Sequence, residues 1–183
     1  ELSKKYALDI SLFERMVRNE VPCVTLEEQH RMRPEISSLM RRDSLYPKLR
    51  DHESVFKYDS VKGVETNIQF ITHTELETDS RESTSYSNPH EAKYTAELAR
   101  YFLNQGYERE QITILTPYKG QVLLLRKEMP RDVFEGVKIT AVDNYQGEEN
   151  DIIILSLVRS SNASPERRNP IGFVGIENRI CVS

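Results

Sequence analysis

Apolar residues recur at helical spacing in several segments of the chain. One stripe follows Ser11, with Glu14 three residues later as in a capping box. Another begins at Asn88-Pro89, an N-cap followed by a first-turn proline, and continues until Gly106. These patterns predict helices over residues 8–18, 89–105 and 120–129, with a further helix beginning at Pro34.

Runs rich in Val, Ile and Leu lie between these helices and predict strands. The runs cover residues 21–26, 67–73, 112–115, 137–142 and 152–158. Continuous apolar strands that alternate with helices indicate an α/β fold, a parallel sheet with helices on both faces. In such sheets ligands bind at the carboxyl ends of the strands. Residues 74–88 are rich in Ser, Thr and Glu without apolar periodicity, and predict a mobile surface loop without chemistry.

Length and composition narrow the class of protein. The 183 residues fit one domain, and 25 basic against 29 acidic residues give a net charge of −4, which excludes a generally basic nucleic-acid-coating protein. Cys23 and Cys181 lie far apart among four scattered histidines, so we expect reduced thiols and no metal site. No apolar run approaches the ~20 residues of a membrane span, and no leader is visible. We therefore expect an intracellular protein, in the cytoplasm or alternatively the nucleus.

Three predicted strand ends carry unusual polar sequence. They read Q-H-R-M-R-P at 29–34, T-P-Y-K-G-Q at 116–121 and V-D-N-Y-Q-G-E-E-N-D at 142–151. Each alone is typical of a solvated loop. Their coincidence at one sheet edge favours a shared site.

These segments resemble, in order, the motifs Q-Y-R-M-H-P, T-P-Y-x-x-Q and V-D-x-x-Q-G-x-E-x-D of superfamily 1 helicases in the up-frameshift and senataxin branch. The sequence N-R-I-C-V at 178–182 resembles the start of the last motif of that branch. Within this branch, the residues of these segments are most similar to those of the NFX-type zinc-finger-containing helicases. The resemblance implies the second RecA-like domain, spanning residues 1–183, of a P-loop NTPase fold. The sequence agrees, because it contains no G-x-x-x-x-G-K-[ST].

The resemblance also implies a nucleotide site. ATP and Mg²⁺ would be bound mainly by a first RecA-like domain, and this domain alone would not hydrolyse ATP. Arg31 is the implied arginine finger, worth about 10³-fold or more in turnover, with a surface salt bridge as its alternative. Gln29 and His30 share its motif, and His30 stands where relatives stack an aromatic ring on adenine; a histidine that supports the strand end is the alternative. The other implied nucleotide-binding residues are Gln146, Gly147 and Glu149, with Glu149 on the ribose.

A groove for single-stranded nucleic acid is implied as well. Its residues by motif match are Thr116, Pro117, Tyr118, Val142 and Asp143. Tyr118 either stacks a base or belongs to the edge of the core. Lys119 or Arg159 would be the phosphate contacts.

The expected function is therefore an ATP-dependent helicase or translocase on single-stranded RNA, with DNA as the less favoured strand and 5′ to 3′ polarity. Relatives continue N-R-I-C-V into A-L-S-R, whose arginine is a second finger; Ser183 stands at the first of these positions, so we expect a longer protein. The alternatives are an ATP-gated RNA clamp that unwinds little, and a non-catalytic RecA-like interaction domain.

Overall fold

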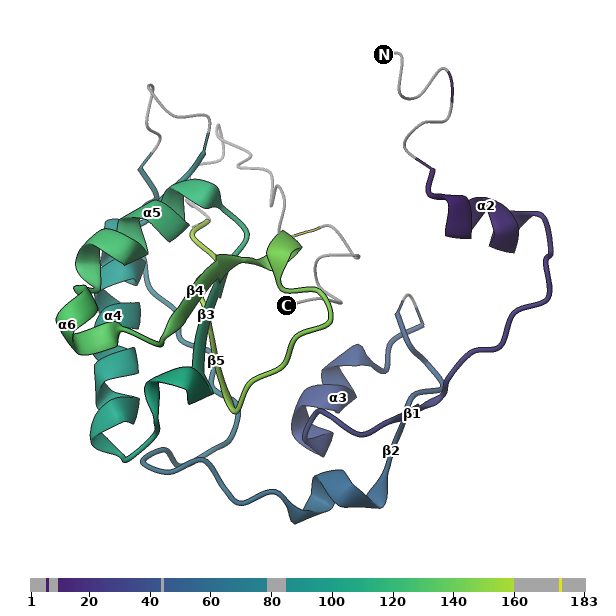
Figure 1. Ribbon diagram of the computed structural model, residues 1–183, viewed down its shortest axis with the longest axis horizontal. Helices are drawn as coiled ribbons and strands as arrows, with labels where there is room; N and C mark the ends of the chain where they lie inside the picture. The colour runs from purple at the N-terminus through teal and green to yellow at the C-terminus, as the bar shows by residue number, and fades with distance from the viewer. Residues whose placement is uncertain (1–5, 7–9, 44, 79–84, 160–174, 176–183) are drawn as a thin grey trace.

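The computed structural model describes residues 6, 10–43, 45–78, 85–159 and 175, and its larger part is a parallel sheet with helices packed against it (Figure 1). The sheet contains β3 (Ile112–Thr116), β4 (Lys138–Ala141) and β5 (Ile152–Leu155), in the spatial order β4-β3-β5. The register places Ile114 between Ile139 and Ile154. All neighbours run parallel, which confirms the predicted α/β class.

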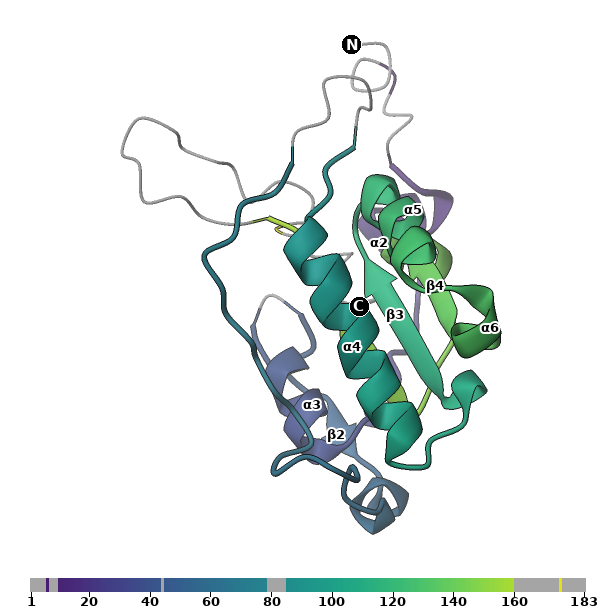
Figure 2. The same ribbon diagram turned by 90° about the vertical axis from the view of Figure 1, so that its left-hand side faces the viewer.

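Helices α4 (Pro89–Asn104) and α5 (Lys119–Glu128) lie side by side on one face of this sheet, next to the short helix α6 (Arg131–Phe134) (Figure 2). The side chain of Asn88 caps α4 by accepting the N–H of Glu91 at 3.1 Å, as the sequence predicts. The main core lies between these helices and the sheet. It contains Ala92, Ala96, Ala99, Phe102, Ile112, Ile114, Leu125, Met129, Phe134, Ile152 and Ile154.

The opposite face of the sheet is covered less completely. Leu115, Val142 and Tyr145 form a small buried cluster there, and Val142 opens the 3₁₀ helix η3 (Val142–Asn144) that follows β4. Strand β3 is buried throughout, whereas Ile153 and Leu155 of β5 are exposed. The apolar run predicted as a strand over 152–158 is therefore a strand only over 152–155, and only one face of that strand is buried.

A smaller part precedes the sheet in the sequence. Two short strands, β1 (Glu28–Gln29) and β2 (Arg50–Asp51), pair in parallel. Helix α3 (Pro34–Met40) lies between β1 and β2 in the sequence, and the 3₁₀ helix η1 (Glu53–Lys57) follows β2. Pro34 begins α3, as predicted.

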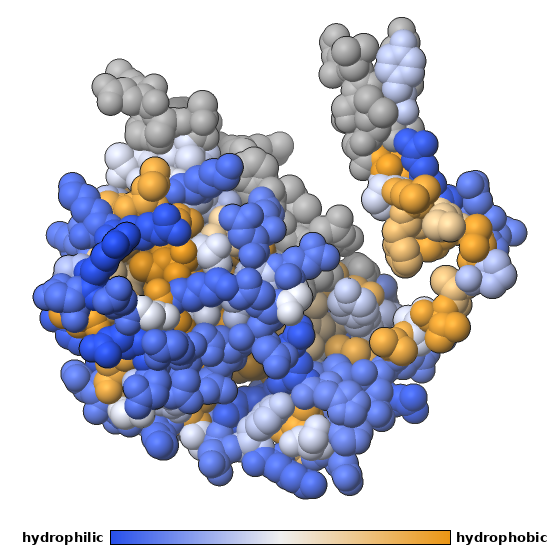
Figure 3. Space-filling view, viewed as in Figure 1, coloured by the Kyte–Doolittle hydropathy of each residue, from blue (hydrophilic) through white to orange (hydrophobic). Residues whose placement is uncertain are grey.

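The arm that carries α2 (Leu12–Arg18) extends away from the sheet (Figure 1). Ser11 caps α2 as predicted, but no residue of this helix is buried. The predicted strand over 21–26 is wrong for this structure, because that stretch pairs with no neighbour and leaves Val24 and Leu26 exposed. Figure 3 shows hydrophobic surface along the arm. The predicted strand over 67–73 is also absent, for the same reason.

The described ends of the predicted loop 74–88 are tied to the sheet domain. Thr78 and Ser87 form an isolated antiparallel bridge, and the hydroxyl of Ser85 accepts the N–H of Gly120 at 2.9 Å. A Cβ at Gly120 would lie 2.9 Å from the carbonyl oxygens of Ser85 and Tyr86, so only glycine fits this contact. Residues 79–84 lie outside the described residues.

Gln121, the last residue of the T-P-Y-K-G-Q segment, is a buried clamp between α4, α5 and the end of β5. Its amide oxygen accepts the N–H of Asn88 at 2.8 Å. Its amide nitrogen donates to the carbonyl of Asn88 at 3.2 Å and to the hydroxyl of Ser156 at 3.0 Å. The glutamine of this motif therefore holds the domain together.

Replacing Gln121 by Met, which keeps the volume but removes these bonds, is expected to lower the free energy of unfolding by about 2 kcal/mol, because buried groups of Asn88 lose their partners. Urea unfolding measures this change. Lys127→Met, at an exposed position of the same helix, is the matched control and should change stability by less than about 0.5 kcal/mol. Equal stability of the two variants would show that the clamp is energetically neutral.

None of the helices in the described part of the chain has both the length and the apolar character that crossing a bilayer requires.

Candidate functional site

The Q-H-R-M-R-P segment begins inside β1 and is shaped by the amide of Gln29. The amide oxygen accepts the N–H of Arg31 at 2.9 Å and the N–H of Met32 at 2.6 Å. The amide nitrogen donates to the carbonyl of Met32 at 2.7 Å and to Asp51 at 2.7 Å. These bonds use the full capacity of the amide. In this structure Gln29 fixes the turn that carries Arg31; its predicted contact with a nucleotide stays a prediction.

Asp51 supports this turn from behind. Its side chain is only 6% exposed, forms an ion pair with Arg41 and accepts the hydroxyl of Ser37 at 2.7 Å. Burial of the Asp51 carboxyl disfavours its charged form and would by itself raise the pKa. The hydrogen bonds from Arg41, Ser37 and Gln29 outweigh burial and hold the pKa below its ordinary value. An ionised carboxylate therefore anchors the turn.

This carboxylate makes stability depend on pH in the acidic range. Because the folded pKa is depressed, the contribution is complete above the unfolded value of about 3.9 and is lost as the pH falls through the lower folded value. Asp51→Asn is expected to lower stability at pH 7 and to flatten its decline below about pH 4. Urea unfolding from neutral to acidic pH measures both effects. Parallel curves for the two proteins would contradict the assignment.

Arg31 and Glu149 form an ion pair, although they are 118 positions apart in the sequence. Their side chains are 55% and 65% exposed. Two residues that the resemblance assigns to a nucleotide site, through separate motifs, therefore meet on the surface. An exposed pair of this kind is worth only about 0–1 kcal/mol, so a phosphate can redirect the guanidinium at little cost.

Arg33, Arg41 and Arg159 are held more firmly than Arg31. The guanidinium of Arg33 donates to the backbone carbonyls of Tyr58 and Asp59, and Arg41 pairs with the buried Asp51. Arg159, proposed from the sequence as a phosphate contact, is 10% exposed, pairs with Glu77 and lies over the ring of Tyr86 at 4.1 Å. In this structure the side chain of Arg159 therefore makes its contacts within the domain.

The loop that carries Glu149 is fixed at both ends. Tyr145 is buried after η3, and the amide of Asn150 donates to the carbonyl of Glu110 and to the hydroxyl of Thr113, each at 2.8 Å. Gly147 has φ +82°, a conformation that favours glycine. Gln146 and Glu149 lie exposed between these anchors. Asn150 therefore ties the loop to β3.

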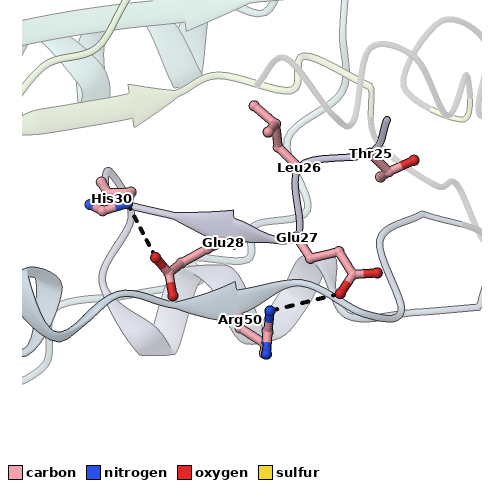
Figure 4. Close-up of a pocket in the computed structure, with 6 residues that line it drawn as sticks. All are labelled: Thr25, Leu26, Glu27, Glu28, His30 and Arg50. Carbon is pink, nitrogen blue, oxygen red and sulfur yellow. Dashed lines mark ion pairs between the residues drawn. The ribbon is translucent and has the colours of Figure 1, made fainter. Parts of the chain in front are cut away.

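His30 lies exposed, and one face of its ring stacks on His52 with ring centroids 3.9 Å apart. The hydroxyl of Tyr58 donates to the carbonyl of His30 at 3.1 Å. A pocket of about 490 Å³ opens beside it, and Figure 4 shows the residues that line it: Thr25, Leu26, Glu27, Glu28, His30 and Arg50.

The residues assigned to the nucleic-acid groove are mostly inside the domain. Thr116 and Val142 are buried, and Tyr118 is 3% exposed and packs edge-on against Tyr86. Pro117 is partly exposed and Asp143 is exposed. In this conformation Tyr118 is a core-edge residue, and contact of this set with nucleic acid stays a prediction.

Comparisons with known proteins show the family to which this chain belongs. Residues 8–183 match the protein family described as AAA domain. This chain belongs to that family. The AAA domain is 49% identical to human and mouse "NFX1-type zinc finger-containing protein 1" over its whole length, which is 9% of each relative. It is 36% identical, over 97% of its length and 17% of the relative, to the fission yeast "Helicase required for RNAi-mediated heterochromatin assembly 1".

A "Regulator of nonsense transcripts 1 homolog" from Drosophila melanogaster is 33% identical over 96% of the AAA domain and 15% of the relative. The AAA domain thus spans less than a fifth of the length of these relatives. They include helicases of the branch that the sequence motifs resemble, and the AAA domain is a helicase-family domain.

Sequence reasoning missed Asp51 and His52. Both lie in a stretch of mixed polarity that follows Tyr46-Pro47 and carries no periodic signal. Their importance arises only from the pairing of β2 with β1, which places Asp51 beside Gln29. A parallel pair of two residues leaves no sequence pattern that could have identified them.

Proposed function

We propose that this AAA domain is the second RecA-like domain of an ATP-dependent RNA helicase or translocase, and that it supplies Arg31 to a nucleotide held by a preceding domain. The observation that carries the proposal is the contact between Arg31 and Glu149. A scaffold has no physical need to bring a phosphate-binding arginine and a ribose acceptor together on an exposed surface.

The chemistry follows from what this chain can and cannot contribute. Phosphoryl transfer builds up negative charge that a positioned arginine stabilises, by about 10³-fold or more. ATP with Mg²⁺, bound mainly elsewhere in the protein, supplies the transferring group. Closure of the two domains would exchange Glu149 for phosphate oxygens at the guanidinium, and Glu149 would be released to the ribose. The turn held by Gln29 and Asp51 fixes the backbone from which Arg31 reaches.

RNA as the strand and 5′ to 3′ polarity belong to the proposal through resemblance to the branch. An intracellular location belongs to it through the two distant cysteines, which are expected to be reduced thiols. RNA-stimulated ATP hydrolysis by the complete protein tests it, together with RNA binding measured with and without a non-hydrolysable ATP analogue. Stimulated turnover and nucleotide-dependent RNA affinity are expected. Absence of turnover with RNA binding indifferent to nucleotide would favour an interaction domain instead.

A second candidate, an ATP-gated RNA clamp that unwinds little, is favoured by His30. An imidazole offers less area to a base than the tyrosine of relatives, and one face of this ring is already covered by His52. A strand-displacement assay on a duplex with a 5′ single-stranded extension separates the two candidates. ATP-dependent displacement supports a helicase, and hydrolysis without displacement supports a clamp.

A further inference from the structure

The β1–β2 pair has two faces of different chemistry. Alternation along a strand directs Gln29 to one face and Glu28 and His30 to the other. The register that pairs Gln29 with Asp51 places His52 next to His30, and the N–H of His52 donates to the carbonyl of Gln29 at 3.0 Å. One face therefore holds the turn, while the other gathers a carboxylate and two imidazoles.

These three side chains are close enough to share one ion. One ligand atom from each of Glu28, His30 and His52 lies within 4.8 Å of the other two. The carboxylate of Glu28 lies 3.5 Å from Nε2 of His30. A tetrahedral Zn²⁺ with bonds of about 2.1 Å separates its ligands by roughly 3.4 Å, which this distance already matches. The in-plane lone pairs of two stacked imidazoles do not converge, so the rings would have to tilt apart to share one ion, which rotation of the exposed His30 ring allows.

His52 has the supporting contact that metal-binding histidines commonly have. Its Nδ1 lies 2.9 Å from the hydroxyl of Ser54 and 3.2 Å from the N–H of Ser54. In this structure Nδ1 accepts the N–H of Ser54, so a neutral His52 ring carries its proton on Nε2. Metal binding through Nε2 would move this proton to Nδ1, which would then donate to the Ser54 hydroxyl and lose the bond from the Ser54 N–H. A bound ion would select this tautomer.

Nearby cations do not block the cluster. Arg50 lies 3.9 Å from Glu27, the neighbour of Glu28, and Arg31 is paired with Glu149 (Figure 4 shows the pairs of Glu27 and Glu28). The pocket described above opens at Glu28 and His30, so water can complete the coordination of an ion there.

The geometry points to a binding site for one divalent transition-metal ion, best matched by Zn²⁺, formed by Glu28, His30 and His52. Two imidazoles and a carboxylate suit Zn²⁺ and disfavour Mg²⁺ and Ca²⁺, which prefer oxygen ligands. The ion would tie the turn that carries Arg31 to β2. The ion would bind a nitrogen at the edge of the His30 ring and leave free the ring face that is not stacked on His52. The metal site therefore does not depend on the proposed contact between His30 and a nucleotide. It also departs from the sequence expectation of no metal site, because its histidines are 22 positions apart.

The test compares metal content among four forms of the complete protein. Each form is equilibrated with buffered Zn²⁺ and assayed by mass spectrometry of the metal, and Co²⁺ spectra report imidazole coordination. His52→Asn removes a ligand but keeps an N-capping side chain for η1, and His30→Phe removes a ligand but keeps an aromatic ring on His52. Glu27→Gln is the matched control. Zinc sites elsewhere in the protein contribute equally to all forms.

Wild type and Glu27→Gln are expected to bind one more Zn²⁺ per chain than the two histidine variants, whose affinity at this site should fall at least about tenfold. A Co²⁺ difference spectrum between wild type and His52→Asn should show the same loss. Equal metal content in all four forms would overturn the proposal. Equal loss in Glu27→Gln would overturn it as well, because it would indicate unspecific carboxylate binding. Circular dichroism confirms that each variant is folded.

Discussion

Replacing Arg31 by alanine is expected to reduce RNA-stimulated ATP hydrolysis by the complete protein about 10³-fold or more, while the AAA domain stays folded. The loss is large because the guanidinium would act on charge that develops in the transition state. The fold is expected to survive because the Arg31 side chain is exposed and its partner Glu149 is exposed too. Steady-state turnover and thermal melting measure the two effects.

Arg42→Ala is the matched control, since Arg42 is an exposed arginine beyond the end of α3 and outside the site. Its turnover should equal that of the wild type. Normal turnover by Arg31→Ala would remove the arginine-finger assignment. A loss of folding in that variant would contradict the exposed placement of the side chain.

Asp51→Ala is expected to reduce turnover about 100-fold through the position of Arg31, because a displacement of about 1 Å in a catalytic group can have an effect of this size. Removal of the carboxylate leaves the amide of Gln29 without one of its four hydrogen bonds and leaves Arg41 without its partner. The turn then loses the support that fixes the backbone of Arg31. Asp51 is thus a positioning residue.

The decisive readout is the separation of kcat from binding. Asp51→Ala should lower kcat while the KM for ATP and the RNA affinity change little, and Asp51→Asn should recover part of the activity because it keeps one acceptor. Adding Asp51→Ala to Arg31→Ala should cause no further loss. Full additivity of the two changes would show that Asp51 acts independently of Arg31.

Local signals predicted the sheet domain well. The Asn88-Pro89 start of α4 and the apolar runs that became β3, β4 and β5 depend on contacts close in sequence and on burial against one core. The run over 21–26 also contains β-branched and apolar residues but forms no strand here, because a strand also needs a neighbour to pair with. N-R-I-C-V at 178–182 lies outside the described residues.

The candidate site likewise contains residues that the sequence motifs predicted and residues that they could not predict. Arg31 and Glu149 follow from motifs, and the structure brings them together. Thr116, Tyr118 and Val142 follow from motifs too, but the structure buries them. Asp51 and His52 gain their roles only from the register of β2 against β1, which composition and periodicity do not encode.

Stabilisation of the transition state of ATP hydrolysis by Arg31 is tested by the affinity of the complete protein for two nucleotide mimics in the presence of RNA. One mimic is a non-hydrolysable ATP analogue, and the other is ADP with aluminium fluoride, which imitates the transferring phosphoryl group. We expect Arg31→Ala to weaken binding of the fluoride complex about 10³-fold and binding of the ATP analogue only slightly. Equal affinities of wild type and variant for both mimics, or an equal loss for both, would contradict this role of Arg31.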